Sequence, residues 1–461
     1  MRYVSTRGGV QGLSFCDAVM MGLADDGGLL VPETIPDVSE DLSQLAEKSY
    51  VDLAAYVMGH FIDDIPAAEL RSIIERSYET FDDPAVTPLV EVGDIHVLEL
   101  FHGPTLAFKD VALQFLGNVF EYVLNKRGGQ LNILGATSGD TGSAAIAAVR
   151  GKKNINIFIM FPEGRMSALQ EKQMTTVLDG NVQNLAIEGS FDDCQSILKS
   201  IFNDLAFKEA YELGAVNSVN WARILAQVVY YFSAYVQLGL PKRFQVAVPT
   251  GNFGNIFAGY IARRMGLPVE TLILATNQND ILHRFFTTGR YERGVVYFSH
   301  SPAMDIQVAS NFERYLYFEF GQSPEKVKEF IENFSTTGLA TTNFNELNAD
   351  VAFTSGRVSD EDTVATIAKI FEESEYLLDP HTAVGVEIGL LNRRLEFPLV
   401  CLATAHPAKF DEVIRQVIPD LEVSHPTLEL LKDLPERKTL LEREVGVVKG
   451  FISTFNDHQV S

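Results

Sequence analysis

Short apolar runs alternate with segments of helical periodicity from about residue 97 onward. Apolar side chains recur at Val111, Phe115 and Val119, which predicts one face of a helix, and Gly128-Gly129 predicts its end. Buried strands are predicted over residues 131–135, 154–161 and 182–187, with helices over residues 143–149 and 191–205. This alternation predicts a compact α/β block.

A second series of alternating elements follows in the C-terminal half. A helix, a strand, a helix and a strand are predicted over residues 221–237, 244–248, 255–264 and 271–275. Residues 277–350 are predicted to be rich in loops. Helices are then predicted over residues 362–373 and from residue 379 onward. A strand over residues 399–403 and a last helix over residues 410–418 follow. The residues after about 420 carry mixed charge and are expected at the periphery.

The length and these patterns predict the domain organisation. At roughly 150 residues per domain, a chain of 461 residues predicts about two to four domains. We expect an N-terminal region over residues 1–95, a smaller α/β domain over 96–212 and a larger α/β domain over 213–461.

The composition is that of an ordinary soluble globular protein, with 46% hydrophobic and 21% charged residues. No stretch approaches the roughly 18 apolar residues of a membrane span, and the first residues lack the apolar core of a secretory signal. The three cysteines lie far apart and form no metal-spaced pair, so we expect reduced thiols and a cytoplasmic location. His381 and His406 have no metal-like neighbours and are expected to be structural.

The net charge of −24 argues against general nucleic-acid binding, because a phosphate backbone requires a basic surface. An acidic balance mostly keeps a protein soluble. A phosphorylated substrate could bind only where a local cluster of donors overcomes the global repulsion. Two loops and one helix start offer such donors.

Two glycine-rich segments each connect a predicted strand to a predicted helix. They are residues 135–142 (GATSGDTG) and residues 249–255 (PTGNFGN). Small residues let backbone N–H groups converge, and the helix dipole favours an anion at a helix start. Each loop could therefore hold a carboxylate or a phosphate. A tight strand-to-helix turn with a helix cap explains either loop alone equally well.

Neither loop matches a nucleotide-binding pattern well. The dinucleotide fingerprint requires G-x-G-x-x-G and an acid at the end of the next strand. The first loop spaces its glycines as G-x-x-x-G-x-x-G, although Glu163 does follow the next strand. The second has only G-x-x-G, and Glu270 lies at the wrong end of the strand that follows. No G-K-[ST] follows either cluster, which excludes a Walker loop.

Further polar groups lie at the entry to the helix predicted over 221–237. Residues 217–223 (NSVNWAR) combine amides, a hydroxyl and a guanidinium that could bind a phosphate, or Asn220 could cap the helix beside a solvated Arg223. Thr404 follows the strand predicted over 399–403. Its hydroxyl points either into a crevice or back to the main chain.

Lys109 is the most informative charged residue because of its neighbours. It lies in the mostly uncharged run of residues 101–110 that opens a strongly apolar helix. A lysine ammonium is strongly hydrated. Among apolar neighbours, its amine therefore either extends to water or is held in the neutral form. A neutral, partly desolvated amine can form a Schiff base with a carbonyl compound. Together with the two loops, Lys109 suggests a site for pyridoxal phosphate (PLP).

These segments together resemble threonine synthase, of the group found in many bacteria and fungi. The resemblance covers most of the chain, and its segments occur in the expected order. Besides those above, it rests on residues 3–9 (YVSTRGG), 24–29 (ADDGGL), 302–306 (PAMDI), 310–314 (SNFER), 379–385 (DPHTAVG) and 403–410 (ATAHPAKF). Residues 302–314 look like an insertion typical of this group.

The resemblance implies the fold type II architecture of PLP enzymes (tryptophan synthase β-like). Two α/β domains would hold the cofactor in a cleft, after an N-terminal extension. Lys109 would carry PLP as an internal Schiff base, and Thr404 would face the pyridine nitrogen, leaving it unprotonated. The cofactor phosphate would bind to the larger domain, at Gly251, Asn252, Phe253, Gly254 and Asn255.

The resemblance also assigns residues to the substrate. Its carboxylate would lie against Thr137, Ser138, Asp140 and Thr141. Related enzymes can carry an asparagine at the position of Asp140. The phosphate of the substrate would bind to Asn217, Ser218 and Arg223.

The implied reaction converts O-phospho-L-homoserine and water to L-threonine and phosphate, by PLP-dependent γ-elimination and β-hydration. Lys109 would act as acid and base, and the departing phosphate is hypothesised to assist the addition of water. A threonine-synthase-like phospho-lyase that releases 2-oxobutyrate is one alternative, and a non-catalytic PLP- or phosphate-binding protein is another. A serine or threonine dehydratase would leave residues 217–223 without a phosphate to bind. We expect a small-molecule substrate, no nucleic-acid or membrane partner, and a monomer or dimer.

Overall fold

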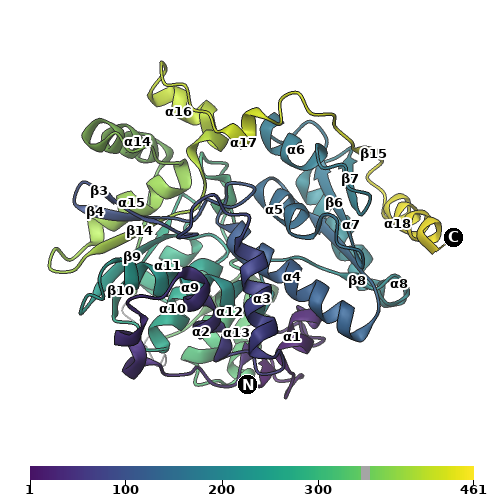
Figure 1. Cartoon of the computed structure of the whole chain (residues 1–461), viewed down its shortest axis with the longest axis horizontal. Helices are drawn as coiled ribbons and strands as arrows, with labels where there is room; N and C mark the ends of the chain where they lie inside the picture. The colour runs from purple at the N-terminus through teal and green to yellow at the C-terminus, as the bar shows by residue number, and fades with distance from the viewer. Residues whose placement is uncertain (344–352, 461) are drawn as a thin grey trace. The chain divides into compact units, whose positions relative to one another are not determined.

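The computed structural model describes residues 1–343 and 353–460, and its elements fall into two compact units (Figure 1). Unit 1 comprises residues 1–19, 23–108 and 218–423, and unit 2 comprises residues 20–22, 109–217 and 424–461. Both units combine a largely or wholly parallel sheet with helices, which confirms the predicted α/β class. The predicted three-part division at residues 95 and 212 stays a prediction.

Unit 1 is built on a six-stranded sheet, as far as the chain is described. Its strands, in spatial order, are β13 (Phe353–Arg357), β10 (Val269–Thr276), β9 (Phe244–Pro249), β14 (Leu399–Ala403), β4 (Ile95–Glu99) and β3 (Leu89–Val92). All neighbours are parallel except the β3–β4 hairpin. Every residue of β9 and β14 is buried, as expected for central parallel strands covered on both faces.

Helices and small strands complete unit 1. The helix α15 (Pro380–Asn392) packs against β9, β10 and β14, and α9 (Trp221–Gln237) packs against α10 (Gly254–Arg264). The N-terminal segments join this unit through an aromatic cluster in which the Trp221 ring lies 6.0 Å from those of Tyr3 and Phe61. The other elements include β1 (Tyr3–Ser5), α1 (Phe15–Met21), β2 (Leu30–Pro32), η1 (Ser39–Leu45), α2 (Tyr50–Gly59), α3 (Ala67–Tyr78), η2 (Pro302–Met304), α14 (Asp360–Ser374), η4 (Pro407–Phe410) and α16 (Asp411–Val417).

Unit 2 is built on a parallel sheet. Within the described chain its strands, in spatial order, are β15 (Thr439–Leu441), β7 (Val182–Ile187), β6 (Ile155–Pro162), β5 (Leu131–Ala136) and β8 (Leu213–Gly214). The helices α4 (Lys109–Arg127) and α5 (Asp140–Val149) pack closely, because residue 117 is a glycine whose added Cβ would lie 2.4 Å from the Ala148 carbonyl oxygen. The remaining helices are α6 (Ala168–Thr175), α7 (Phe191–Asn203), α8 (Leu205–Ala210), α17 (Pro426–Glu429) and α18 (Val445–Val460).

The prediction that residues 277–350 are rich in loops is wrong for most of that stretch; residues 344–350 lie outside the described residues. It contains α11 (Ile281–Thr288), β11 (Arg290–Glu292), α12 (Phe312–Glu319), α13 (Pro324–Thr337) and β12 (Leu339–Thr341). Every residue of α12 is buried, including Glu313, Arg314 and Glu319, so the charged positions of this helix do not mark a solvent-exposed face.

The prediction that the C-terminal residues are peripheral is also wrong. The strand β15 pairs with β7 in the sheet of unit 2. Val448 and Ile452 of α18 are fully buried in the hydrophobic core formed by β5, β6, β7 and α7. The sequence pattern here is short: it consists of two apolar positions one turn apart and a strand of three residues. The charged residues around it hide this pattern.

No helix in the described ranges combines the length and the apolar character needed to cross a membrane.

Candidate active site

Lys109 is the first residue of α4, and a short ladder fixes the chain just before it. The Phe108 N–H donates to the Thr404 carbonyl oxygen at 2.9 Å, and the His406 N–H donates to the Leu106 carbonyl oxygen at 3.1 Å. Ala107 and Ala405 form an antiparallel bridge between these two bonds. The segments predicted around Lys109 and Thr404, far apart in sequence, are therefore adjacent along this ladder.

The amine of Lys109 lies beside a carboxylate rather than in purely apolar company. Its Nζ is 3.3 Å from Oδ2 of Asp140, and the two side chains are 12% and 7% exposed. Gln170 Nε2 donates to the other oxygen, Oδ1, at 3.1 Å. This contact arises because α4 and α5 begin side by side and each contributes one charged residue.

The loop of residues 135–142 is organised by the hydroxyl of Thr137. This Oγ1 accepts from the N–H groups of Gly139 at 3.1 Å and Gly142 at 3.0 Å, and it donates to the Gly139 carbonyl at 2.9 Å. A hydroxyl has one donor and two acceptor sites, so this capacity is used within the loop. Ser138 is exposed and Thr141 is half-buried, and neither hydroxyl makes a side-chain hydrogen bond to the described chain.

The loop of residues 249–255 ends at Asn255, whose buried side-chain amide has an unused hydrogen-bond donor within the described chain. Phe253 adopts φ +64°, in the left-handed region, as it enters α10. Tyr230 donates to Oδ1 of Asn255 at 2.5 Å, and Tyr231 lies 3.2 Å from the same oxygen. Burial raises the pKa of both tyrosines well above the usual value, so both remain protonated donors. Nδ2 of Asn255 is buried and has no hydrogen-bond partner in the part of the chain described.

Arg223, in the first turn of α9, is a buried cation without a carboxylate. Its side chain is part of a residue only 4% exposed, and burial lowers the pKa of the guanidinium to about 10. Nε and Nη1 have no hydrogen-bond partner among the described residues. Burying an unpaired cation is costly unless an anion is supplied. The alternative of a solvated Arg223 is therefore wrong.

The neighbours of Arg223 show which groups are already used. The predicted cap is confirmed, because Asn220 Oδ1 accepts from the Ala222 N–H at 3.0 Å. Ser218 Oγ lies 2.9 Å from Ser310 Oγ. Asn217 is half-buried and directly precedes Ser218.

Thr404 follows β14 and is held from its backbone. Its N–H donates to Oγ1 of Thr382 at 3.2 Å, and the hydroxyl of Thr382 in turn donates to the carboxylate of Asp379. Asp379 also caps α15 through the N–H groups of His381 and Thr382. Thr404 is 6% exposed, and its hydroxyl makes no side-chain hydrogen bond within residues 1–343 and 353–460.

The histidines of residues 379–385 and 403–410 both have structural contacts, in agreement with the prediction. His381 Nδ1 lies 2.9 Å from Asp379, and its Nε2 accepts from the Ala303 N–H at 3.2 Å. The proton of a neutral His381 is therefore on Nδ1. His406 Nδ1 accepts from the Ala408 N–H at 3.1 Å and caps η4.

Comparison with known proteins decides the family. The chain matches "Threonine synthase N terminus" over residues 2–78, "Pyridoxal-phosphate dependent enzyme" over 81–398 and "Threonine synthase, C-terminal" over 382–452. It is 49% identical over 460 residues to the threonine synthase of Pseudomonas aeruginosa, covering 98% of each chain. The chain belongs to the threonine synthase family.

Solved structures of threonine synthases show the same fold. The PLP-bound threonine synthase from Brucella melitensis superimposes with a TM-score of 0.96 at 46% identity, covering 99% of each chain. The threonine synthase from yeast gives a TM-score of 0.94 at 44% identity, again over 99% of each chain. The protein is therefore a PLP-dependent lyase of fold type II, as predicted.

Several residues outside the predicted site set bond to predicted site residues or to residues that do so. They are Gln170, Tyr230, Tyr231, Thr382, Asp379, Ser310, Asn311 and Arg314. The segments 310–314 and 379–385 were recognised as family motifs, and that was the available signal. The aromatic pair in α9 and Gln170 in α6 carried none.

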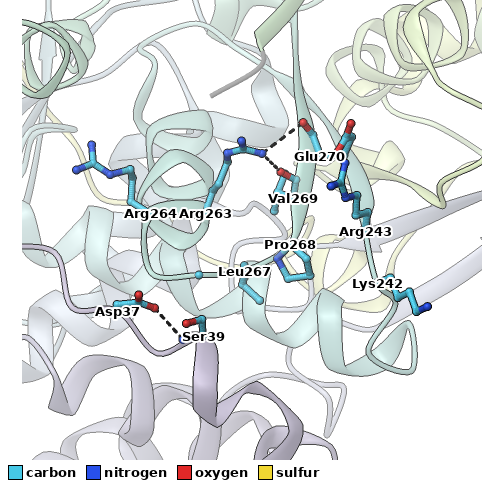
Figure 2. A pocket seen from close by; sticks show the side chains of 11 residues that line it. Asp37, Ser39, Lys242, Arg243, Arg263, Arg264, Leu267, Pro268, Val269 and Glu270 are labelled. Carbon is cyan, nitrogen blue, oxygen red and sulfur yellow. Dashed lines mark hydrogen bonds and ion pairs between the residues drawn. The ribbon is translucent and has the colours of Figure 1, made fainter. Parts of the chain in front are cut away.

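A separate depression lies on unit 1, with a volume of about 440 Å³ and several cations in its lining (Figure 2). Its arginines are already bonded: Arg243 pairs with Glu270 at 2.7 Å, Arg264 donates to the Tyr260 hydroxyl at 2.7 Å, and Arg263 donates to the Val269 carbonyl. None of the predicted site residues lines this depression. The candidate active site is elsewhere.

Proposed function

We propose that the protein converts O-phospho-L-homoserine and water to L-threonine and phosphate, with Lys109 as the residue that carries PLP. The observation that carries the choice of substrate is the buried guanidinium of Arg223, whose Nε and Nη1 have no partner in the described chain. A phosphorylated substrate supplies the missing anion. A substrate without a phosphate would leave this cation buried and unpaired, at a cost of several kcal/mol (about 3–5).

The residues at the start of α10 fit the phosphate of the cofactor. Asn255 offers a buried, unused Nδ2, and the helix start adds backbone donors and a favourable dipole. Gly251, Asn252, Phe253 and Gly254 would complete this cradle, and the hydroxyl of Thr404 would face the ring nitrogen. When bound, PLP supplies the electron sink that makes the α-proton of the substrate acidic.

Lys109 would move protons at its Nζ once the substrate has taken its place on the cofactor. Asp140, 3.3 Å away, would hold this amine over the reacting carbon atoms. Its carboxylate would repel the carboxylate of the substrate, so within the first loop we assign the direct contacts to Ser138 and Thr141. Thr137 would act by shaping the loop, because its hydroxyl is already bonded to Gly139 and Gly142.

Arg223 and Ser218, together with Asn217, would bind the substrate phosphate and neutralise it as it leaves. These local donors would overcome the repulsion from the net charge of −24 at this position. The hydration step needs shielding from stray water, and the burial of Arg223 and Asn255 places both donors out of bulk solvent.

Product identification tests the proposal. The purified protein with PLP is given O-phospho-L-homoserine, and the organic product is identified by NMR while released phosphate is measured. L-threonine in step with phosphate is the expected result. Phosphate with 2-oxobutyrate would make the protein a phospho-lyase. If neither threonine nor 2-oxobutyrate forms, the non-catalytic alternative would be supported. The protein without PLP is the control.

The cytoplasmic location and the choice between monomer and dimer stay predictions. Cell fractionation and light scattering would test them.

A further inference from the structure

Three residues at the start of α12 connect two segments of unit 1 that the proposed function assigns to different phosphates. We call Ser310, Asn311 and Arg314 the clamp. Ser310 Oγ lies 2.9 Å from Ser218 Oγ, in the segment assigned to the substrate phosphate. The same hydroxyl donates to Oδ1 of Asn252, in the loop assigned to the cofactor phosphate, at 3.3 Å. One side chain thus contacts both segments.

Asn311 makes the same connection through the main chain. Its Nδ2 donates to the Ser218 carbonyl at 3.2 Å and to the Asn252 carbonyl at 3.2 Å. Its backbone N–H donates to that Asn252 carbonyl as well, at 3.0 Å. Asn311 is fully buried, so these bonds do not compete with bulk water.

Arg314 fixes the orientation of Asn311. The guanidinium is fully buried, and burial lowers its pKa to about 9, so it remains a cation at neutral pH. It donates to Oδ1 of Asn311, to the Val219 carbonyl and, through Nε at 3.1 Å, to the Leu30 carbonyl. Because Oδ1 faces this cation, Nδ2 must face the two carbonyls.

Two glycines of the cofactor loop make room for residues 302–314. A Cβ added at Gly254 would lie 3.3 Å from Nδ2 of Asn311. A Cβ added at Gly251 would lie 3.0 Å from the Ala303 carbonyl oxygen. The loop and this segment are therefore fitted to each other, with little freedom to slide.

We propose that the clamp sets the separation between the two phosphate-binding segments, and so selects the chain length of the phosphorylated amino acid. This inference rests on the proposed function. The substrate reacts at the cofactor, whose own phosphate is anchored at residues 251–255. A fixed distance from that anchor to Ser218 admits a phosphate on the γ-position and leaves a phosphate one bond shorter out of reach.

The test uses two amino acids whose C–P bond cannot be broken by phosphate elimination. 2-Amino-5-phosphonopentanoate has the length of O-phospho-L-homoserine, and 2-amino-4-phosphonobutanoate has that of O-phospho-L-serine. Calorimetry on the PLP-loaded protein gives the Kd of each, and the clamp predicts that the longer compound binds more tightly. In Ser310→Ala this preference should fall about fivefold, the equivalent of one hydrogen bond, by loss of affinity for the longer compound.

Two matched variants and one further measurement separate positioning from general damage. Ser310→Thr keeps the hydroxyl and should restore the preference, and Ser323→Ala, at the cap of α13, should leave it unchanged. The Kd for PLP should stay within about twofold in all three variants, since the backbone of residues 251–255 is intact.

Equal weakening of both compounds in Ser310→Ala, or an unchanged preference, would overturn the role of the clamp. The outcome does not depend on turnover. A protein that prefers the longer compound but releases no threonine would contradict the proposed function and not the clamp. An active synthase without length selectivity would do the reverse.

Discussion

The two glycine-rich loops occupy equivalent places in the two units, yet they carry opposite features. Residues 135–142 connect β5 to α5, and residues 249–255 connect β9 to α10. In the first, the helix begins with Asp140, whose carboxylate already faces the amine of Lys109. In the second, the first turn carries Asn255, whose buried Nδ2 has no partner in the described chain. Both loops looked alike as anion sites.

The difference teaches that a glycine-rich strand-to-helix turn does not by itself indicate what binds there. A carboxylate at a helix start interacts favourably with the helix dipole, so the first loop supplies part of its own anion. The second loop supplies donors only. The first loop therefore pairs with an amine, and the second loop fits the phosphate that we propose binds there.

The strongest test of the first loop removes the amine. Lys109→Ala should lower turnover by more than about 1000-fold, because both the attachment of PLP and the proton transfers are lost. The absorbance of bound PLP should disappear while the circular dichroism spectrum stays unchanged. Activity close to that of the unmodified protein would contradict the assignment of Lys109.

Arg223→Ala tests whether the unpaired cation serves the substrate. We expect kcat/KM for O-phospho-L-homoserine to fall roughly 100-fold, since charged hydrogen bonds contribute about 1.5–3 kcal/mol each. The Kd for PLP, followed by absorbance titration, should change by less than about twofold. Equal losses in both measurements would place Arg223 on the cofactor or in the fold.

Asp140→Asn removes the charge that distinguishes the two loops. The amide can still accept a hydrogen bond from Lys109, so we expect kcat to fall about tenfold with KM nearly constant. Steady-state kinetics with O-phospho-L-homoserine separates the two constants. A raised KM with an unchanged kcat would instead assign Asp140 to the carboxylate of the substrate.

Asn255→Ala removes the spare donor of the second loop and should weaken cofactor binding rather than turnover. Loss of one hydrogen bond to a charged phosphate predicts a Kd for PLP raised about tenfold, with kcat at saturating PLP nearly unchanged. Tyr230→Phe is the comparison variant: it removes a hydroxyl that orients the amide and also donates to Gln227 Oε1 at 3.3 Å, and it should raise this Kd about threefold. A larger effect in Tyr230→Phe than in Asn255→Ala would contradict the role of Nδ2.

The sequence predicted the elements that appear as long apolar helices or as continuous apolar runs. The helices α4 and α9 and the buried strands β6, β9 and β14 were all found in this way. The helix α12 was missed because its eight residues include three charged positions, Glu313, Arg314 and Glu319, which tertiary contacts bury. The helix α18 was missed because its fully buried positions, Val448 and Ile452, are few and the segment just before it, residues 432–444, is rich in charge.

Contacts within the candidate site were harder to predict than its residues. The family motifs identified Lys109 and Asp140 separately, but their 3.3 Å contact depends on how α4 and α5 pack. Likewise, nothing local to Ser310 indicates that it lies between Ser218 and Asn252. Such contacts between distant parts of the chain follow from tertiary packing, which periodicity does not encode.

The close approach of α4 and α5 at Gly117 has a consequence for engineering this enzyme. A single methyl group at that position would meet the Ala148 carbonyl and push the middle of α4 away from the C-terminal end of α5. Lys109 and Asp140 are the first residues of these two helices, so a change in helix packing at Gly117 would also move their side chains relative to each other. We therefore expect a side chain at position 117 to change the distance between Lys109 and Asp140 from two turns away.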